Sequence, residues 1–276
     1  MKRDPVAPLE YSRRWSLRAW VLLVFAFLYI PLLTLVIFSF NDSKRNIVWK
    51  GFTLKYYEKA LANETLHAAF INSLTIALVA TLVSVILGVL AAILLWRFRF
   101  PFKSGVDGMM ALPIVVPEIA MGVSLLIFLA KLRWPTDLPW PLNLNAIMIA
   151  HITFCFPFVA TVVRARLGSF NSEEEEAARD LGATEFRVFW DVLLPHLQPA
   201  IVAGALLAFT LSLDDFVITF FTSGPDTITL PVKIYSMVRF SVTPEVNAAS
   251  TFLLILTIAA TVIAMRMQKQ GGAGGH

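Results

Sequence analysis

Residues 68–96 read AAFINSLTIALVATLVSVILGVLAAILLW, a run of 29 residues without Asp, Glu, Lys or Arg. About 20 apolar residues, at a rise of about 1.5 Å each, are enough for an α-helix to cross the hydrocarbon core of a bilayer. The stretch therefore predicts a transmembrane helix that is long enough to tilt or to project past the bilayer.

Five further stretches have a similar length and character: 19–40, 107–130, 142–163, 198–222 and 246–265. The composition agrees, because 57% of the 276 residues are hydrophobic and only 15% are charged. An average soluble domain carries about 25% charged residues. The sequence therefore predicts an all-α membrane protein with six transmembrane helices, in one domain over residues 19–266.

The first apolar stretch follows the basic segment 1–18 and superficially resembles a signal peptide. It runs from Ala19 to Phe40, 22 residues without a charge, and no small-residue cleavage site follows it. The apolar part of a signal peptide is shorter, about 7–15 residues. We therefore expect an uncleaved first span. At the other end we expect a cytoplasmic tail at 267–276, whose Gly-rich end is excluded from the predicted fold.

The distribution of basic residues predicts the orientation. With the N-terminus in the cytoplasm, 14 of the 23 Lys and Arg residues fall on the cytoplasmic side. Cytoplasmic loops carry such an excess in membrane proteins. Both termini are therefore expected in the cytoplasm, together with the loop 165–197 between the fourth and fifth spans.

This loop contains the sequence SEEEEAARDLG at residues 172–182. Ser172 is expected to cap a helix, with Glu175 completing a capping box. Gly182 would end that helix, Thr184 would cap the next one, and Pro195 would end it. The pattern predicts a short helix-turn-helix at the cytoplasmic face of the membrane.

The same loop resembles the E-A-A-x3-G-x9-I-x-L-P signature of binding-protein-dependent ABC importer permeases, with Val192 in place of the isoleucine. In that family the loop is a coupling helix that docks on the ATP-binding subunit and transmits its closure to the membrane helices. The resemblance assigns this coupling role to Glu176, Ala177, Ala178, Gly182, Leu194 and Pro195. A charged helix that merely caps the bundle is the alternative interpretation.

A second stretch, FTLSLDDFVI at 209–218, followed by TSGP at 222–225, resembles the second permease subunit of spermidine/putrescine importers. This resemblance extends in order from about residue 20 to residue 265. It implies a bacterial inner-membrane heterodimer with a different second permease chain. It also implies two ATP-binding subunits, which would hold ATP and Mg²⁺, and a periplasmic polyamine-binding protein.

Three carboxylates lie inside predicted spans: Glu118 in the third, and Asp214 and Asp215 in the fifth. Ionisable groups at membrane depth are costly and commonly face a polar pathway or a partner. No basic residue shares these spans, so the three carboxylates would suit the passage of a cationic polyamine. Alternatively, Asp214 caps or braces a helix, or pairs with a cation on the partner subunit.

Other chemistry has little support in the sequence. The patterns HExxH, GxSxG and CxxC and a Gly-rich phosphate loop do not occur, and Cys155 is the lone cysteine. His151 is expected to make a hydrogen bond in helix packing, and the histidines show no metal-ligand spacing. The chain is therefore expected to be a transport subunit without cofactor or metal, with ATP hydrolysis on other subunits.

Three alternatives stay open. A permease of the same class could carry another solute, although carboxylates in the path would repel an anion. A channel or secondary transporter working alone would leave the loop 165–197 unexplained, and six spans without an internal repeat make a poor complete carrier. A membrane-embedded enzyme would need a catalytic set that the sequence lacks.

Overall fold

The computed structural model of the chain describes residues 15–43, 48–132, 143–240 and 243–272. Within these ranges the regular elements are helices, and no strand is formed. In chain order the elements are α1 (Trp15–Ser39), α2 (Lys55–Ala62), α3 (Glu64–Arg97), α4 (Lys103–Val115), α5 (Glu118–Leu132), α6 (Leu144–Leu167), α7 (Ser172–Asp180), α8 (Glu185–Arg187), the π-helix η2 (Val188–Leu193), α9 (Leu194–Leu213), α10 (Val217–Thr222), α11 (Leu230–Phe240) and α12 (Pro244–Gly272). Residues 1–14 of the predicted N-terminal segment and 273–276 of the tail lie outside the described residues.

Five of the described helices are long and apolar enough to cross a membrane. They cover Trp15–Phe38, Glu64–Arg97, Leu144–Leu167, Glu185–Leu213 and Pro244–Ile263. The consecutive helices α4 and α5 qualify together as one further span, bent by 113°. The predicted class, an all-α membrane protein with six spans, is thereby confirmed.

Two of the predicted spans contain a break. Residues 107–130 form parts of α4 and α5, which are separated by Val116 and Pro117. Proline has no backbone N–H and its ring clashes with the preceding turn, so a helix bends or stops there. Residues 198–222 form most of α9 and all of α10, with the break at 214–216. Such breaks are tolerated at membrane depth where protein or a polar cavity surrounds the free backbone groups.

The chain divides into two compact units, and each is described by itself. The smaller unit comprises Met1–Ala62 and Met237–Phe252. In it, the Tyr56 hydroxyl donates a hydrogen bond of 2.6 Å to the carbonyl of Ser43. The ring of Tyr57 packs edge-on against Phe252, with centroids 5.5 Å apart. These contacts attach the short helix α2 to the segment that precedes it in sequence and to the N-terminal part of α12.

The larger unit comprises Asn63–Ser236 and Leu253–His276, and its core lies where α3, α6 and α9 pack together. Small residues allow this close approach, as they do between membrane helices in general. A Cβ atom built on Gly88 of α3 would lie 2.7 Å from the Cβ of Val159 in α6, and one on Gly204 of α9 would lie 3.0 Å from Cγ1 of the same valine. Val159 therefore fills the space that the two glycines leave.

Candidate functional site

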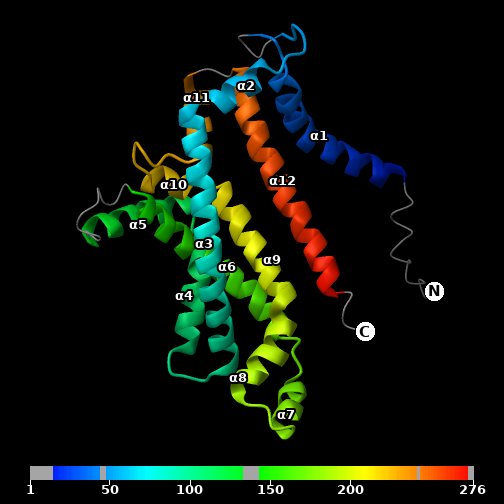
Figure 1. Cartoon of the computed structure of the whole chain (residues 1–276), viewed down its shortest axis with the longest axis vertical. Coiled ribbons are helices and arrows are strands. Elements are labelled where there is room, and N and C mark those ends of the chain that lie inside the picture. The colour runs from blue at the N-terminus through cyan, green and yellow to red at the C-terminus, as the bar shows by residue number, and fades with distance from the viewer. Residues whose placement is uncertain (1–14, 44–47, 133–142, 241–242, 273–276) are drawn as a thin grey trace, which may run out of the picture. The chain divides into compact units, whose positions relative to one another are not determined.

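The loop between α6 and α9 forms a hairpin of α7, α8 and η2 (residues 171–195), which we call the cytoplasmic hairpin after the side of the membrane that the Lys and Arg distribution predicts for it. Figure 1 shows it projecting beyond the end of the α3–α6 pair. Its first helix is capped by Asn171, whose side chain accepts from the N–H of Glu173 at 3.1 Å. The predicted cap at Ser172 and its capping box with Glu175 are therefore wrong. Asn and Ser are equally good caps, so the sequence alone does not show which of the adjacent residues Asn171 and Ser172 is the cap.

Gly182 ends α7 as predicted, in the left-handed region at φ +84°. Its N–H donates to the carbonyl of Arg179 at 2.8 Å, and the next N–H, of Ala183, donates to Ala178 at 3.0 Å. This pair of bonds is the Schellman arrangement, in which glycine is favoured because it has no Cβ. Thr184 then caps α8 as predicted, accepting from the N–H of Arg187 at 3.4 Å.

Pro195 does not end the second helix, which corrects the prediction. The chain continues from α8 through the π-helix η2 into α9, and Pro195 is the second residue of α9. The Leu194 N–H reaches back five residues to the carbonyl of Phe189. A proline inside a continuous helix removes one backbone hydrogen bond and crowds the carbonyl four residues earlier, and here the π turn changes the bonding pattern directly before Pro195. Single π turns inside helices occur frequently at functional sites.

A network of four charged side chains joins the two arms of the cytoplasmic hairpin to α3. Arg97, the last residue of α3, donates to Glu175 at 3.1 Å and to Glu185 at 3.3 Å. Arg179 donates to the same two carboxylates, at 3.0 and 2.8 Å respectively. Glu175 is only 5% exposed, so its charge is balanced by both guanidinium groups within the protein. The hydrogen bond from Arg179 lowers the pKa of the exposed Glu185 carboxyl.

Aromatic rings hold the base of the hairpin. Trp96 of α3 packs edge-on against Phe170, with ring centroids 5.8 Å apart, and Phe170 packs in turn on His196 at 5.0 Å. The guanidinium of Arg166, near the end of α6, donates to the His196 carbonyl at 3.1 Å. The ends of α3 and α6 and the start of α9 are therefore fastened together beneath the hairpin.

The outer side of the hairpin carries apolar groups next to acidic ones. Leu181 is 90% exposed and Phe186 is 70% exposed, while Glu176 is also at the surface. An open groove lies between α7 and the η2–α9 junction, lined by Glu174, Ala177, Ala178, Leu181, Asp191, Val192, Pro195 and His196. Three predicted coupling residues thus line this groove: Ala177, Ala178 and Pro195. Sequence reasoning missed the exposure of Leu181.

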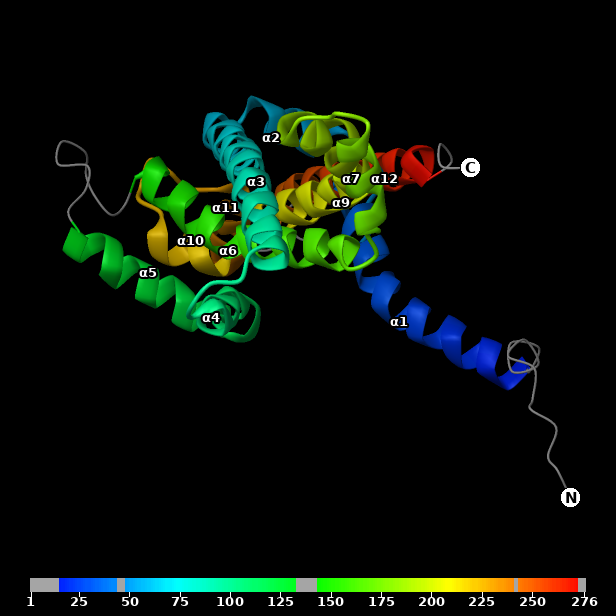
Figure 2. The same ribbon diagram turned by 90° about the horizontal axis from the view of Figure 1, so that it is seen from below.

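The two helix breaks bring Glu118 and Asp214 together. Glu118 begins α5, Asp214 follows α9, and both are exposed on this chain. Helix α5 lies beside α10 (Figure 1, Figure 2), where Gly122 leaves room for the ring of Phe221. Two carboxylates far apart in sequence therefore lie at the breaks that precede two packed helices, α5 and α10.

Asp215 points the other way. Its side chain is 3% exposed and accepts hydrogen bonds from the N–H groups of Ile218 and Thr219, at 3.3 and 2.8 Å. The Thr219 hydroxyl also donates to it at 2.8 Å. Asp215 therefore binds the first turn of α10, and its position differs from that of its neighbour Asp214.

His151 makes hydrogen bonds in helix packing, as predicted. Its Nδ1 lies 2.7 Å from the Ser212 hydroxyl of α9, and its Nε2 lies 2.9 Å from the Thr219 hydroxyl of α10. Since Thr219 gives its one hydroxyl proton to Asp215, Nε2 must be the donor to Thr219. The buried histidine therefore joins α6 to both sides of the second break.

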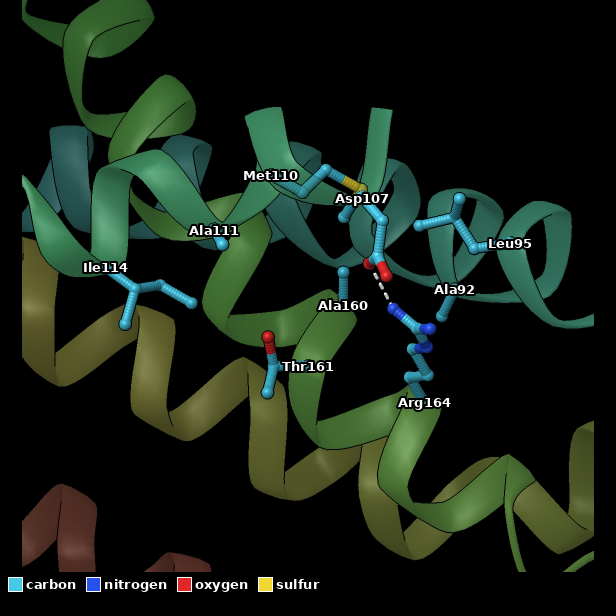
Figure 3. Close-up of a pocket in the computed structure, with 9 residues that line it drawn as sticks. All are labelled: Ala92, Leu95, Asp107, Met110, Ala111, Ile114, Ala160, Thr161 and Arg164. Carbon is cyan, nitrogen blue, oxygen red and sulfur yellow. Dashed lines mark hydrogen bonds and ion pairs between the residues drawn. The ribbon is translucent and has the colours of Figure 1, made fainter. Parts of the chain in front are cut away.

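A further ion pair lies near the start of α4. Figure 3 shows Arg164 of α6 reaching Asp107 of α4 across a pocket lined by Thr161 and by apolar side chains of α3, α4 and α6. No residue of α4 is buried, so this pair is an important contact between α4 and the core. Among the described residues, no group of three or more His, Cys, Asp or Glu side chains could hold a metal ion.

Comparison with known proteins gives a consistent result. The profile described as "Binding-protein-dependent transport system inner membrane component" matches residues 84–270. The chain is 44% identical to the putrescine transport system permease protein PotI of Escherichia coli, over 91% of each chain. It is 40% identical to the spermidine/putrescine transport system permease protein PotC of Haemophilus influenzae, over 94% of this chain and 98% of that protein.

Solved structures show the same fold at low sequence identity. A chain of a bacterial ABC transporter that imports the acidic polysaccharide alginate matches with a TM-score of 0.73 at 18% identity, over 95% of this chain and 97% of that one. A chain of a methionine ABC transporter in an inward-facing conformation matches with a TM-score of 0.62 at 18% identity, over 76% and 99% of the two chains.

Proposed function

The chain belongs to the family of binding-protein-dependent transport system inner membrane components, and we propose that it is a permease subunit of an ATP-driven importer of polyamines. The observation that carries the substrate assignment is the pair of exposed carboxylates, Glu118 and Asp214, at the helix breaks that precede the packed helices α5 and α10. A di- or tri-cationic amine must lose water to cross the membrane, and carboxylates along its path offset part of that cost. Relatives that are 40–44% identical carry names with the same substrate class.

The cytoplasmic hairpin is proposed to dock on an ATP-binding subunit. Its exposed Leu181 and Phe186 would enter an apolar depression there, and Glu176 would meet a basic group. The small side chains of Ala177 and Ala178 leave the groove open for a partner's side chain. ATP and Mg²⁺ would be held by that subunit, with no cofactor on this chain.

Asp215 is proposed to act as a brace and not as part of the substrate path. Its carboxylate already accepts from two backbone N–H groups and one hydroxyl, and these bonds stabilise its buried charge. Asp214, one residue earlier, is an exposed residue on this chain. This assignment narrows the path predicted from the sequence to Glu118 and Asp214.

The remaining partners follow from the mechanism of alternating access. One bundle of six spans does not enclose an aqueous path, so a second permease chain is needed, and the resemblance implies that it is a different one. A periplasmic binding protein would deliver the amine. One solved relative is an alginate transporter in complex with a periplasmic protein. Both termini are proposed to lie in the cytoplasm, in agreement with the Lys and Arg distribution.

Uptake of radiolabelled putrescine and spermidine into proteoliposomes tests the proposal. The liposomes would contain the complete complex, and the binding protein would be added outside. Glu118→Gln and Asp214→Asn should each lower the initial uptake rate while the basal ATPase rate and the melting temperature stay unchanged. Glu58→Gln, which neutralises an exposed carboxylate on α2, is the control and should leave uptake unchanged.

Two outcomes contradict the proposal. Normal amine uptake by both variants would exclude the acidic path. Uptake of a different solute by the wild-type complex, with no amine uptake, would exclude the polyamine assignment and favour another permease of the same class. A structural role for the carboxylates would instead lower the melting temperature and the yield of the complex together with transport.

A further inference from the structure

Helix α3 is in polar contact with the cytoplasmic hairpin at its C-terminal end. Arg97 uses its two terminal nitrogens on two different carboxylates, Glu175 on the first arm and Glu185 on the second. The planar guanidinium holds such a pair of bonds in a fixed geometry, which a lysine ammonium does not do. The position of one arginine thereby depends on both arms of the hairpin.

The N-terminal half of α3 is in polar contact with a second segment. The Ser73 hydroxyl accepts a hydrogen bond of 2.8 Å from the N–H of Leu230, and the Asn72 amide donates to the carbonyl of Ile228 at 3.2 Å. Ser73 and Leu230 are both buried. The segment 228–230 follows α10 by a few residues and leads into α11, so α10 and a short connection separate it from the second helix break.

Between these contacts α3 has no proline, and its 34 residues correspond to a length of about 50 Å. Its small residues pack closely on α6: the Ser84 hydroxyl donates to the Ile152 carbonyl, and Gly88 lies against Val159. Helices packed in this way move as rigid bodies more readily than they bend. Movement applied at one end of α3 is therefore expected at the other.

The hairpin is covalently continuous with α6 and α9, and its Glu175 is 78 residues away from Arg97 in sequence. Its movement therefore reaches α3 through the two hydrogen bonds of Arg97 and through the packing of α3 on α6 and α9. We propose that Arg97 and Ser73 are positioning residues at the two ends of α3, through which a movement of the cytoplasmic hairpin reaches the segment 228–230 that follows α10. The inference rests on the proposed docking of the hairpin on the ATP-binding subunit.

Hydrogen–deuterium exchange on the complete complex in nanodiscs tests this link without any transported solute. Exchange of the peptides 172–187 and 228–232 would be compared in nucleotide-free and ATP-bound complexes. The wild-type protein should show a nucleotide-dependent change in both peptides. In Arg97→Gln, exchange at 172–187 should rise about twofold to thirtyfold, which is the range that single residues contribute to coupling, and the response at 228–232 should be lost.

Two variants and a control locate the link. Arg97→Lys keeps the charge but not the fork, and it should retain part of the response. Ser73→Ala should leave the hairpin peptide as in the wild type and abolish the nucleotide response at 228–232. Arg99→Gln removes an exposed charge two residues from Arg97 and should change neither peptide.

A nucleotide response at 228–232 that survives in Arg97→Gln overturns the link, and so does its absence from the wild-type complex. Equal loss in Arg99→Gln would assign the effect to net charge and overturn the role of Arg97. Failure of the polyamine assignment gives a different result: the wild-type complex would transport no amine while its exchange pattern still responded to ATP.

Discussion

Replacement of Gly182 gives the sharpest test of the cytoplasmic hairpin, because the structure separates two possible costs. At φ +84° the backbone is in the left-handed region, but a Cβ built on Gly182 would meet no atom of this chain within 4 Å. The cost is therefore conformational and not steric. An L-residue destabilises the backbone conformation at this position by about 1–2 kcal/mol, which corresponds to a loss of about fivefold to thirtyfold in the population of the native turn.

The defects of Gly182→Asn, Gly182→Ala and Gly182→Val should increase as the new residue tolerates a positive φ less well. Asn adopts this region most easily and a β-branched residue least easily. We expect the smallest defect for Asn and the largest for Val. The matched control is Gly168→Ala, since Gly168 lies in the same loop with φ −65°, and an added Cβ there would be 3.4 Å from its nearest neighbour.

The assay combines initial amine uptake in membrane vesicles with co-purification of the ATP-binding subunits. All variants should insert into the membrane at the wild-type level, while docking and uptake fall together along the series. Wild-type transport by Gly182→Val at normal expression would refute the role of the turn. An Asn variant as defective as Val would show that bulk at the docking surface matters and not φ.

Three shorter predictions follow from other parts of the chain. A cysteine introduced at Asn63 should react with an impermeant thiol reagent added outside, and one introduced at Ser172 should not. The native Cys155 is buried and should not react. Reversed labelling would contradict the predicted orientation. Gly88→Ala should lower stability by about 1–3 kcal/mol through overpacking, measured as a drop in melting temperature, and Val159→Ala in the same chain should restore part of it. The hydrogen bond from Arg179 lowers the pKa of Glu185. The Arg179–Glu185 ion pair should therefore be intact above the ordinary Glu pKa and should be lost as the pH falls through the lowered pKa. An NMR titration that gives this carboxyl a pKa at or above the ordinary Glu value would contradict the prediction.

The amino-acid sequence by itself determined the class of the protein and the local shape of its hairpin. Long apolar runs predict membrane helices because so much apolar surface is stable in the lipid bilayer and not in water. Gly182 and Thr184 act on neighbouring backbone groups, and their predicted positions at the turn are confirmed. The two local errors, the cap at Ser172 and the stop at Pro195, arise where two adjacent residues compete or where a π turn accommodates a proline.

Only the tertiary structure decided which charged groups meet. Asp214 and Asp215 are neighbours in sequence, yet one is exposed near Glu118 and the other binds the first turn of α10. In the sequence, only its place at the end of an apolar run distinguishes Arg97, although in the structure it joins both arms of the hairpin. Local sequence sets helix boundaries through interactions over a few residues, whereas these contacts join segments many residues apart. They therefore depend on how the helices pack and where they break.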